Sequence, residues 1–173
     1  MEAINDFNRI WSNIEKIVIS KVRENLKRGF VDINDVNHAY QQQIKKWEHS
    51  SLQEHVWFTD LKSKNEALAL QLYNKAVSFQ LQKSRDVISS PLPYYAASLI
   101  VAIVVYFLIS YWADVSLLKN ILFAVVALVV MCSILLPISA SQQDKSKDRI
   151  AEEYRSQMKK LQGELEAICS SFD

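Results

Sequence analysis

The chain has 173 residues, room for about one domain, and its 20 Lys and Arg against 19 Asp and Glu give a formal net charge of +1. This balance excludes the clustered excess of positive charge that marks a nucleic-acid-binding surface, so we expect no direct DNA binding. The whole chain contains only two Gly and three Pro. Few turns are therefore available, and the composition predicts an all-α fold.

Residues 1–90 are predicted to form a helical domain that begins with two amphipathic helices. The first ends near Gly29, a residue type that favours helix C-termini, and the second starts at Asp32 or Asn34, which both favour N-caps. Apolar side chains recur at intervals of three or four residues in both helices: Ile4, Phe7, Trp11, Ile14 and Val18 in the first, and Val36, Tyr40, Ile44 and Trp47 in the second.

A further helix is predicted to start with Ser50 or Ser51 as its N-cap, and Glu54 stands where a capping box places its acidic residue. We expect this helix to continue without a break towards Arg85. Its apolar positions are Leu61, Leu68, Leu72, Ala76 and Phe79. The Pro-containing segment 89–93 then ends it, because the residue before a Pro disfavours the helical conformation.

Residues 91–140 contain two apolar segments without charge, 92–112 and 121–140. An α-helix needs roughly 20 such residues to cross the ~30 Å hydrocarbon core of a bilayer, and both segments have that length. A chain this small cannot bury two such helices in a soluble core. The connecting residues 113–120 are so few that the two helices must run antiparallel. The sequence therefore predicts a two-span transmembrane helical hairpin.

Basic residues flank the outer ends of this hairpin, whereas its connection carries only Lys119. Positive charge is enriched in the cytoplasmic segments of membrane proteins. The flanking residues are Lys75, Lys83 and Arg85 before the first span, and Lys145, Lys147 and Arg149 after the second. We therefore expect a multi-pass protein of the bacterial inner (cytoplasmic) membrane with both termini in the cytoplasm.

Residues 141–173 are predicted to form a cytoplasmic amphipathic helix with one apolar stripe. The stripe consists of Ile150, Tyr154, Met158, Leu161, Leu165 and Ile168. It must be buried, and two partners are possible. The helix can pack on residues 1–90 in a small bundle, or it can join copies of the protein as a coiled coil.

The sequence offers no arrangement of residues typical of catalysis. His49 and His55 do not share a helical face, so they lack the spacing of a helical metal site, and His38 is remote from both. Cys132 and Cys169 belong to no metal-binding motif and are expected to be free thiols. Phosphate-binding loops and nucleophile motifs are missing from the sequence as well. We therefore predict no cofactor, no metal site and no enzymatic activity.

The plan of the chain, helical segments combined with membrane-spanning helices in this length, resembles the small membrane accessory protein of type VI-B CRISPR systems. The resemblance implies a divergent HEPN-like helical fold and an oligomeric pore that depolarises infected cells, in support of an RNA-guided RNA nuclease. HEPN nucleases use an Arg four to six residues before a His. No Arg stands at these positions before His38, His49 or His55, which argues against RNase activity.

Three functions remain open at this point. The first is an oligomeric membrane pore in antiviral defence, which requires several copies because one hairpin encloses no aqueous path. Its candidate lining residues are Ser98, Ser110, Ser133 and Ser139, although such hydroxyls also bond back to their own helix. The second is a membrane-anchored interaction or scaffold protein. The third, and least supported, is a HEPN-like RNase. The expected partners are the lipid bilayer, further copies of the chain and an RNA-guided nuclease complex.

Overall fold

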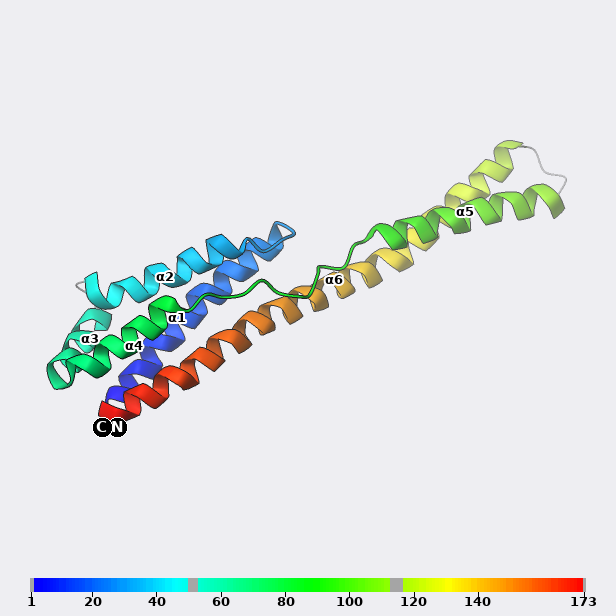
Figure 1. Cartoon of the computed structure of the whole chain (residues 1–173). Coiled ribbons are helices and arrows are strands. Elements are labelled where there is room, and N and C mark those ends of the chain that lie inside the picture. The colour runs from blue at the N-terminus through cyan, green and yellow to red at the C-terminus, as the bar shows by residue number, and fades with distance from the viewer. Residues whose placement is uncertain (1, 50–52, 113–116, 173) are drawn as a thin grey trace. The chain divides into compact units, whose positions relative to one another are not determined.

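The computed structural model describes residues 2–49, 53–112 and 117–172 (Figure 1). Within these ranges every regular element is a helix, so the predicted all-α fold is confirmed. The elements are α1 (Glu2–Lys27), α2 (Ile33–His49), α3 (Gln53–Lys64), α4 (Glu66–Ser78), α5 (Leu92–Trp112), α6 (Leu117–Cys169) and the short 3-10 helix η1 (Ser170–Phe172). The chain forms two compact units. We call Met1–Asp86 with Arg149–Asp173 the helical domain, and Val87–Asp148 the apolar pair.

The turn between α1 and α2 follows the predicted chemistry. Gly29 has a φ of 94°, a conformation that residues with a Cβ rarely adopt, and its N–H donates to the carbonyl of Leu26 at 3.2 Å. The Oδ1 atom of Asp32 accepts from the N–H of Asn34 at 2.9 Å. Asp32 therefore caps α2, and Asn34 lies inside the helix.

The prediction of one long helix towards Arg85 is wrong, because the helix is broken at Asn65. The side chain of Asn65 accepts a hydrogen bond from the N–H of Leu68 at 3.2 Å and starts α4. An Asn side chain that bonds to nearby backbone competes with helix continuation. Helix α4 then ends at Ser78, and residues 79–86, which we call the strap, form no helix. The predicted caps Ser50 and Ser51 lie outside the described residues.

The break at Asn65 also changes which side chains of this region are buried. In α4 the buried residues are Ala69, Leu72 and Ala76, whereas Leu68 is half-buried. The apolar face was predicted for one helix that continues without a break past residue 64. A new helix start resets the rotation of the following residues, so Ala69 takes the buried position that was expected for Leu68.

Aromatic side chains fill the core of the helical domain. The rings of Trp47 and Trp57 meet edge to face at 5.3 Å between centroids, and those of Phe7 and Trp11 stack at 5.7 Å. Such contacts add to the large apolar area that each ring removes from water. Trp47 and Phe58 are almost completely buried. These rings therefore form the core of the helical domain.

The C-terminal part of α6 completes this core. Five of the six predicted stripe residues are buried there: Ile150, Tyr154, Met158, Leu161 and Leu165. The sixth, Ile168, is half-buried, and Cys169 is fully buried in its place. Polar contacts fasten the same segment to α1, since Arg155 Nε donates to Glu15 at 3.1 Å and Gln162 Nε2 donates to Asn8 at 3.1 Å. The stripe is therefore buried within the chain itself.

Helix α6 is continuous from Leu117 to Cys169 and contains Pro137. The second apolar segment, predicted at 121–140, and the amphipathic helix predicted at 141–173 are thus parts of one helix. The first and last described elements of the helical domain, α1 and η1, are in contact (Figure 1).

Candidate functional sites in the apolar pair and the helical domain

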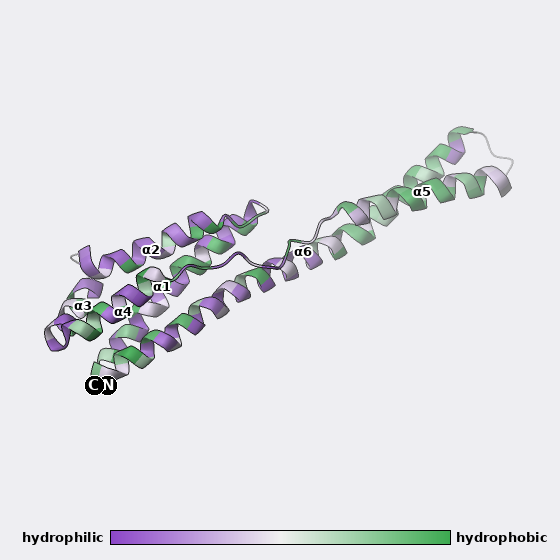
Figure 2. Ribbon diagram, in the orientation of Figure 1, coloured by the Kyte–Doolittle hydropathy of each residue, from purple (hydrophilic) through white to green (hydrophobic). Residues whose placement is uncertain are grey.

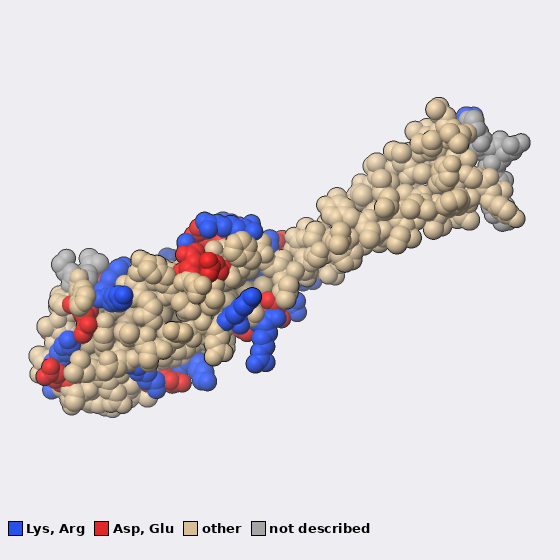
Figure 3. All heavy atoms as spheres, turned by 45° about the horizontal axis from the view of Figure 1, so that its top comes forward, with Lys and Arg blue, Asp and Glu red and all other residues tan. Residues whose placement is uncertain are grey.

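Two helices are long and apolar enough to cross a membrane, and their apolar side chains are exposed. Only 11% of the most apolar window of α5, and 0% of that of α6, is buried. A core helix of a soluble protein would instead be mostly buried. Figure 2 shows that most of α5 and of the first part of α6 is coloured as hydrophobic. In the view of Figure 3 the charged side chains gather over the helical domain, and the apolar pair carries almost none.

The four serines proposed as pore-lining residues have different surroundings. The hydroxyl of Ser98 donates to the carbonyl of Tyr94 at 2.9 Å, and that of Ser133 donates to the carbonyl of Val129 at 2.8 Å. Both therefore bond back to their own helix, which was the alternative interpretation. Ser98 and Ser139 are buried, and Ser110 and Ser133 are exposed. In this conformation only Ser110 and Ser133 can face a lumen.

One polar contact links the two helices of the apolar pair. Asn120 Nδ2 donates to the Oγ of Ser110 at 3.1 Å. Asn120 is 6% exposed, and its Oδ1 has no hydrogen-bond partner. A buried acceptor without a donor costs free energy. Sequence reasoning missed Asn120 as a site residue, although an Asn next to an apolar segment was a visible signal.

An open, apolar groove of about 310 Å³ lies between α5 and α6. The small side chains of Ala102 and Ala124 leave room there for larger neighbours to form the walls. These neighbours are Ile103, Tyr106, Phe107, Ile121, Val125 and Leu128. Small residues of this kind allow close approach of a further helix in a membrane.

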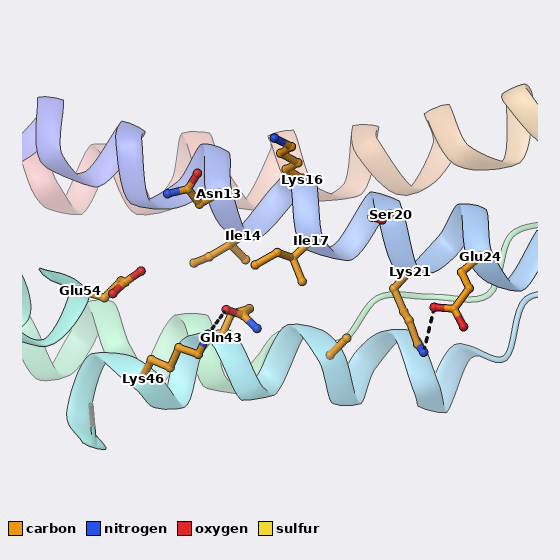
Figure 4. Close-up of a pocket in the computed structure, with 11 residues that line it drawn as sticks. Asn13, Ile14, Lys16, Ile17, Ser20, Lys21, Glu24, Gln43, Lys46 and Glu54 are labelled. Atoms are coloured by element: carbon orange, nitrogen blue, oxygen red, sulfur yellow. Dashed lines mark hydrogen bonds and ion pairs between the residues drawn. The ribbon is translucent and has the colours of Figure 1, made fainter. Parts of the chain in front are cut away.

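A larger hollow of about 550 Å³, the charged groove, lies between α1, α2 and α3 in the helical domain (Figure 4). Ile14 and Ile17 form its apolar floor, and Ile17 is 41% exposed. Charged and polar side chains from three helices surround this floor: Asn13, Lys16, Ser20, Lys21 and Glu24 from α1, Gln43 and Lys46 from α2, and Glu54 from α3. No motif in the sequence marks this groove, because its side chains come from three separate helices.

The charges at one end of the groove neutralise one another. Lys21 Nζ lies 3.1 Å from Asp35 Oδ2 and 3.3 Å from Glu24 Oε2. The hydrogen bond to Asp35, followed by that to Glu24, raises the pKa of Lys21, and the bond from Lys21 lowers the pKa of Asp35. At the other end, Lys46 Nζ donates to Gln43 Oε1 at 2.7 Å. The groove therefore has an apolar floor with rims of both charge signs.

The strap is held by side chains from two helices. Gln157 of α6 donates from Nε2 to the carbonyl of Gln82 at 3.1 Å and accepts from the N–H of Gln82 at 2.8 Å. Asn37 of α2 makes the same pair of bonds with Leu81. The Ser84 hydroxyl bonds to Glu153 of α6. These side chains satisfy the backbone groups that a helix would pair internally, and this accounts for the extended conformation.

His38 and His55 contact polar groups close to them in the sequence. His55 Nδ1 lies 3.0 Å from the carbonyl of Trp47, and the Gln42 amide lies 2.9 Å from His38 Nε2. Among the described residues, no group of three or more His, Cys, Asp and Glu side chains has a metal-binding arrangement. Comparisons of the chain with protein-family models, with curated proteins and with solved structures found no match.

Proposed function

We propose that this chain is a membrane-anchored interaction protein. Its two spans form a transmembrane hairpin in the bacterial inner membrane, and its helical domain lies in the cytoplasm and binds a partner protein. The observation that carries the proposal is the exposure of the apolar pair: of the most apolar window, only 11% is buried in α5 and 0% in α6. Lipid is the environment that accepts such a surface without cost.

The distribution of polar atoms in the apolar pair supports an anchor over a channel wall. Ser98 and Ser139 are buried, and the Asn120 amide is turned towards Ser110. Ser110 and Ser133 are exposed, but most of the outer surface consists of large apolar side chains, such as Phe107 at 64% and Leu122 at 61% exposure. A lipid-facing surface has this composition, whereas a water-filled lumen needs polar side chains.

The orientation rests on the basic residues beside the spans. Lys145, Lys147 and Arg149 follow the second span, Lys83 and Arg85 precede the first, and Lys119 stands alone at the connection. The positive-inside rule then places both termini, and with them the helical domain, in the cytoplasm. The charged groove, with its exposed Ile17, offers this domain a surface for a partner.

The topology is tested with reporter fusions in cells. A reporter that is active only in the periplasm should stay silent at either terminus and become active when inserted between Asp114 and Lys119. A cytoplasm-active reporter at the same three sites gives the reciprocal control. Activity of the periplasmic reporter at the C-terminus would contradict the two-span hairpin.

A second candidate is the oligomeric pore that the resemblance to type VI-B accessory proteins implies, acting by depolarisation in CRISPR-associated antiviral defence beside an RNA-guided nuclease. The open groove between α5 and α6 favours it, because a helix of another copy can pack against Ala102 and Ala124. Ser110 and Ser133 are then the exposed lining candidates.

A potential-sensitive dye in expressing cells separates the two functions. If copies pack into the groove, Ala124→Leu should abolish depolarisation, whereas Ala97→Leu, at an exposed position outside the groove, should leave it intact. An anchor that stays monomeric in detergent and changes no membrane potential would exclude the pore.

A further inference from the structure

A basic hollow of about 390 Å³ lies between α1 and the C-terminal part of α6 in the helical domain. It is open at the surface, and its size lies within the ~300–1,000 Å³ of small-molecule sites. Its lining residues are Ser12, Glu15, Lys16, Ile19, Ser20, Arg23 and Arg155. It shares Lys16 and Ser20 with the charged groove but lies on the side of α1 that faces α6. The proposal below does not depend on the proposed membrane anchor.

Two of the cationic side chains that line this hollow form no polar contact with the described residues of the helical domain. Among the described residues, neither Lys16 nor Arg23 forms a hydrogen bond or an ion pair, and both side chains are exposed. In Figure 4, Lys16 points away from Gln43 and Lys46 of α2, to the other side of α1. Lys16 and Arg23 are two turns apart on α1, so their long side chains can reach one group between them.

The third cation is fixed in place. Arg155 Nε donates to Glu15 at 3.1 Å, and its Nη1 donates to Glu152 at 2.6 Å. Two carboxylates therefore orient the guanidinium, and its Nη2 makes no bond that the described residues show. An Arg that is already held loses little side-chain entropy when it binds a further anion. Glu15 and Glu152 offset part of the positive charge, but Lys16 and Arg23 are not offset.

The hydroxyl of Ser20, between Lys16 and Arg23 on α1, adds a neutral donor, whereas Ser12 lines the hollow about 12 Å further along the helix. Guanidinium, ammonium and hydroxyl groups together match the oxygens of a phosphate, which carries up to two negative charges and three strong acceptors. A carboxylate presents only two oxygens, and it would use fewer of these donors. Ile19 supplies an apolar part of the wall that suits the organic group of a phosphate ester.

We propose that the basic hollow binds the terminal phosphate of a phosphate monoester through Lys16, Arg23 and Arg155, with Ser20 as a further donor. The ester is either a soluble metabolite or the headgroup of a lipid such as phosphatidic acid. Both sources present the same chemistry to the hollow, so they are separated by experiment.

The test uses the full chain purified in detergent. Binding of inorganic phosphate and of AMP is measured by calorimetry, with chloride at equal ionic strength as the reference. The lipid source is tested by adding phosphatidic acid to mixed micelles of the detergent and phosphatidylcholine and measuring the shift in the thermal unfolding temperature. The double variant Lys16→Gln/Arg23→Gln should bind the effective probe about tenfold more weakly or worse, because two charge-assisted contacts are lost. Lys27→Gln/Lys159→Gln removes the same charge at exposed positions outside the hollow and should bind as the wild type does.

Each outcome decides the proposal. Binding of AMP without a response to phosphatidic acid assigns a soluble ligand, and the reverse assigns a lipid. Equal unfolding temperatures of both double variants without ligand show that folding is not the cause of lost binding. If no probe binds, or if both double variants lose affinity equally, the attraction is absent or is only general electrostatics, and the proposed site is wrong.

Discussion

Asn37 of α2 holds Leu81 of the strap by both backbone polar atoms of that residue: its Oδ1 accepts from the Leu81 N–H at 2.8 Å, and its Nδ2 donates to the Leu81 carbonyl at 3.1 Å. The amide of Gln157 binds the next residue, Gln82, in the same way from α6. Neighbouring residues of the strap are therefore gripped by two different helices.

The first prediction concerns the two hydrogen bonds between Asn37 and Leu81. Asn37→Ala removes both bonds and leaves the partly buried backbone groups of Leu81 without protein partners, which should cost about 1–3 kcal/mol of unfolding free energy. Amide hydrogen exchange at residue 81 should accelerate more than exchange in α1. Asn34→Ala, at an exposed position of the same helix, is the matched control. An unchanged rate of amide hydrogen exchange at residue 81 in Asn37→Ala would mean that these two hydrogen bonds do not hold the strap.

The second prediction concerns the apolar stripe of α6. Leu161→Asp with Leu165→Asp would place two carboxylates at positions that are at most 3% exposed. Burying them without partners should cost at least about 3 kcal/mol, so the helical domain should unfold or lose its packing. Ser156→Asp with Lys160→Asp, on the exposed face of the same helix and at the same spacing, should change the melting temperature by only a few degrees. Similar melting temperatures for both double variants would contradict the burial of the stripe.

The third prediction ranks two changes at one hydrogen bond of the apolar pair. Ser110→Ala leaves the Asn120 amide buried with no partner at either end, since Oδ1 is already unpaired. Asn120→Leu removes both polar atoms, and the Ser110 hydroxyl can bond to its own helix. Ser110→Ala should therefore destabilise the pair by about 1–2 kcal/mol, whereas Asn120→Leu should be nearly neutral. Unfolding in mixed detergent micelles measures both, and the opposite order would refute this account of Asn120.

The fourth prediction concerns alkaline pH. Burial raises the pKa of Tyr40 above its usual value of 10.0, and burial raises the pKa of Tyr154 as well. Above about pH 10 the unfolded chain releases the Tyr40 proton while the folded chain retains it, so the folded state binds more protons and its stability falls as the pH rises. Below that pH the contribution of Tyr40 is fully present.

Tyr40→Phe should therefore flatten the loss of unfolding free energy above about pH 10. At neutral pH the variant should be about 1 kcal/mol less stable, because the Tyr40 hydroxyl donates to the carbonyl of Ala76 at 2.7 Å. The wild-type slope, measured in the same titration, is the reference. An unchanged slope in Tyr40→Phe would show that this hydroxyl ionises in the folded protein as it does in the unfolded one.

Local sequence signals were sufficient wherever the cause of a structure lies within a few residues. Gly29 ends the first helix because it tolerates a positive φ, and Asp32 starts the second because its carboxylate reaches the next N–H groups. The apolar segments were recognisable because length and lack of charge are properties of the sequence itself. The same holds for the core positions of α2, whose buried residues match the predicted ones.

Tertiary contacts decided the rest. The strap is extended because Asn37 and Gln157 supply its hydrogen bonds, and these residues are far from it in the sequence. The charged groove and the basic hollow each combine side chains from separate helices, so no single stretch of sequence contains either. Along α6 the buried stripe drifts from the expected Ile168 to Cys169, because a straight α-helix turns once per 3.6 residues and not per 3.5. Hydropathy favoured Ile168, but the direction of the neighbouring helices determines which side chain is enclosed.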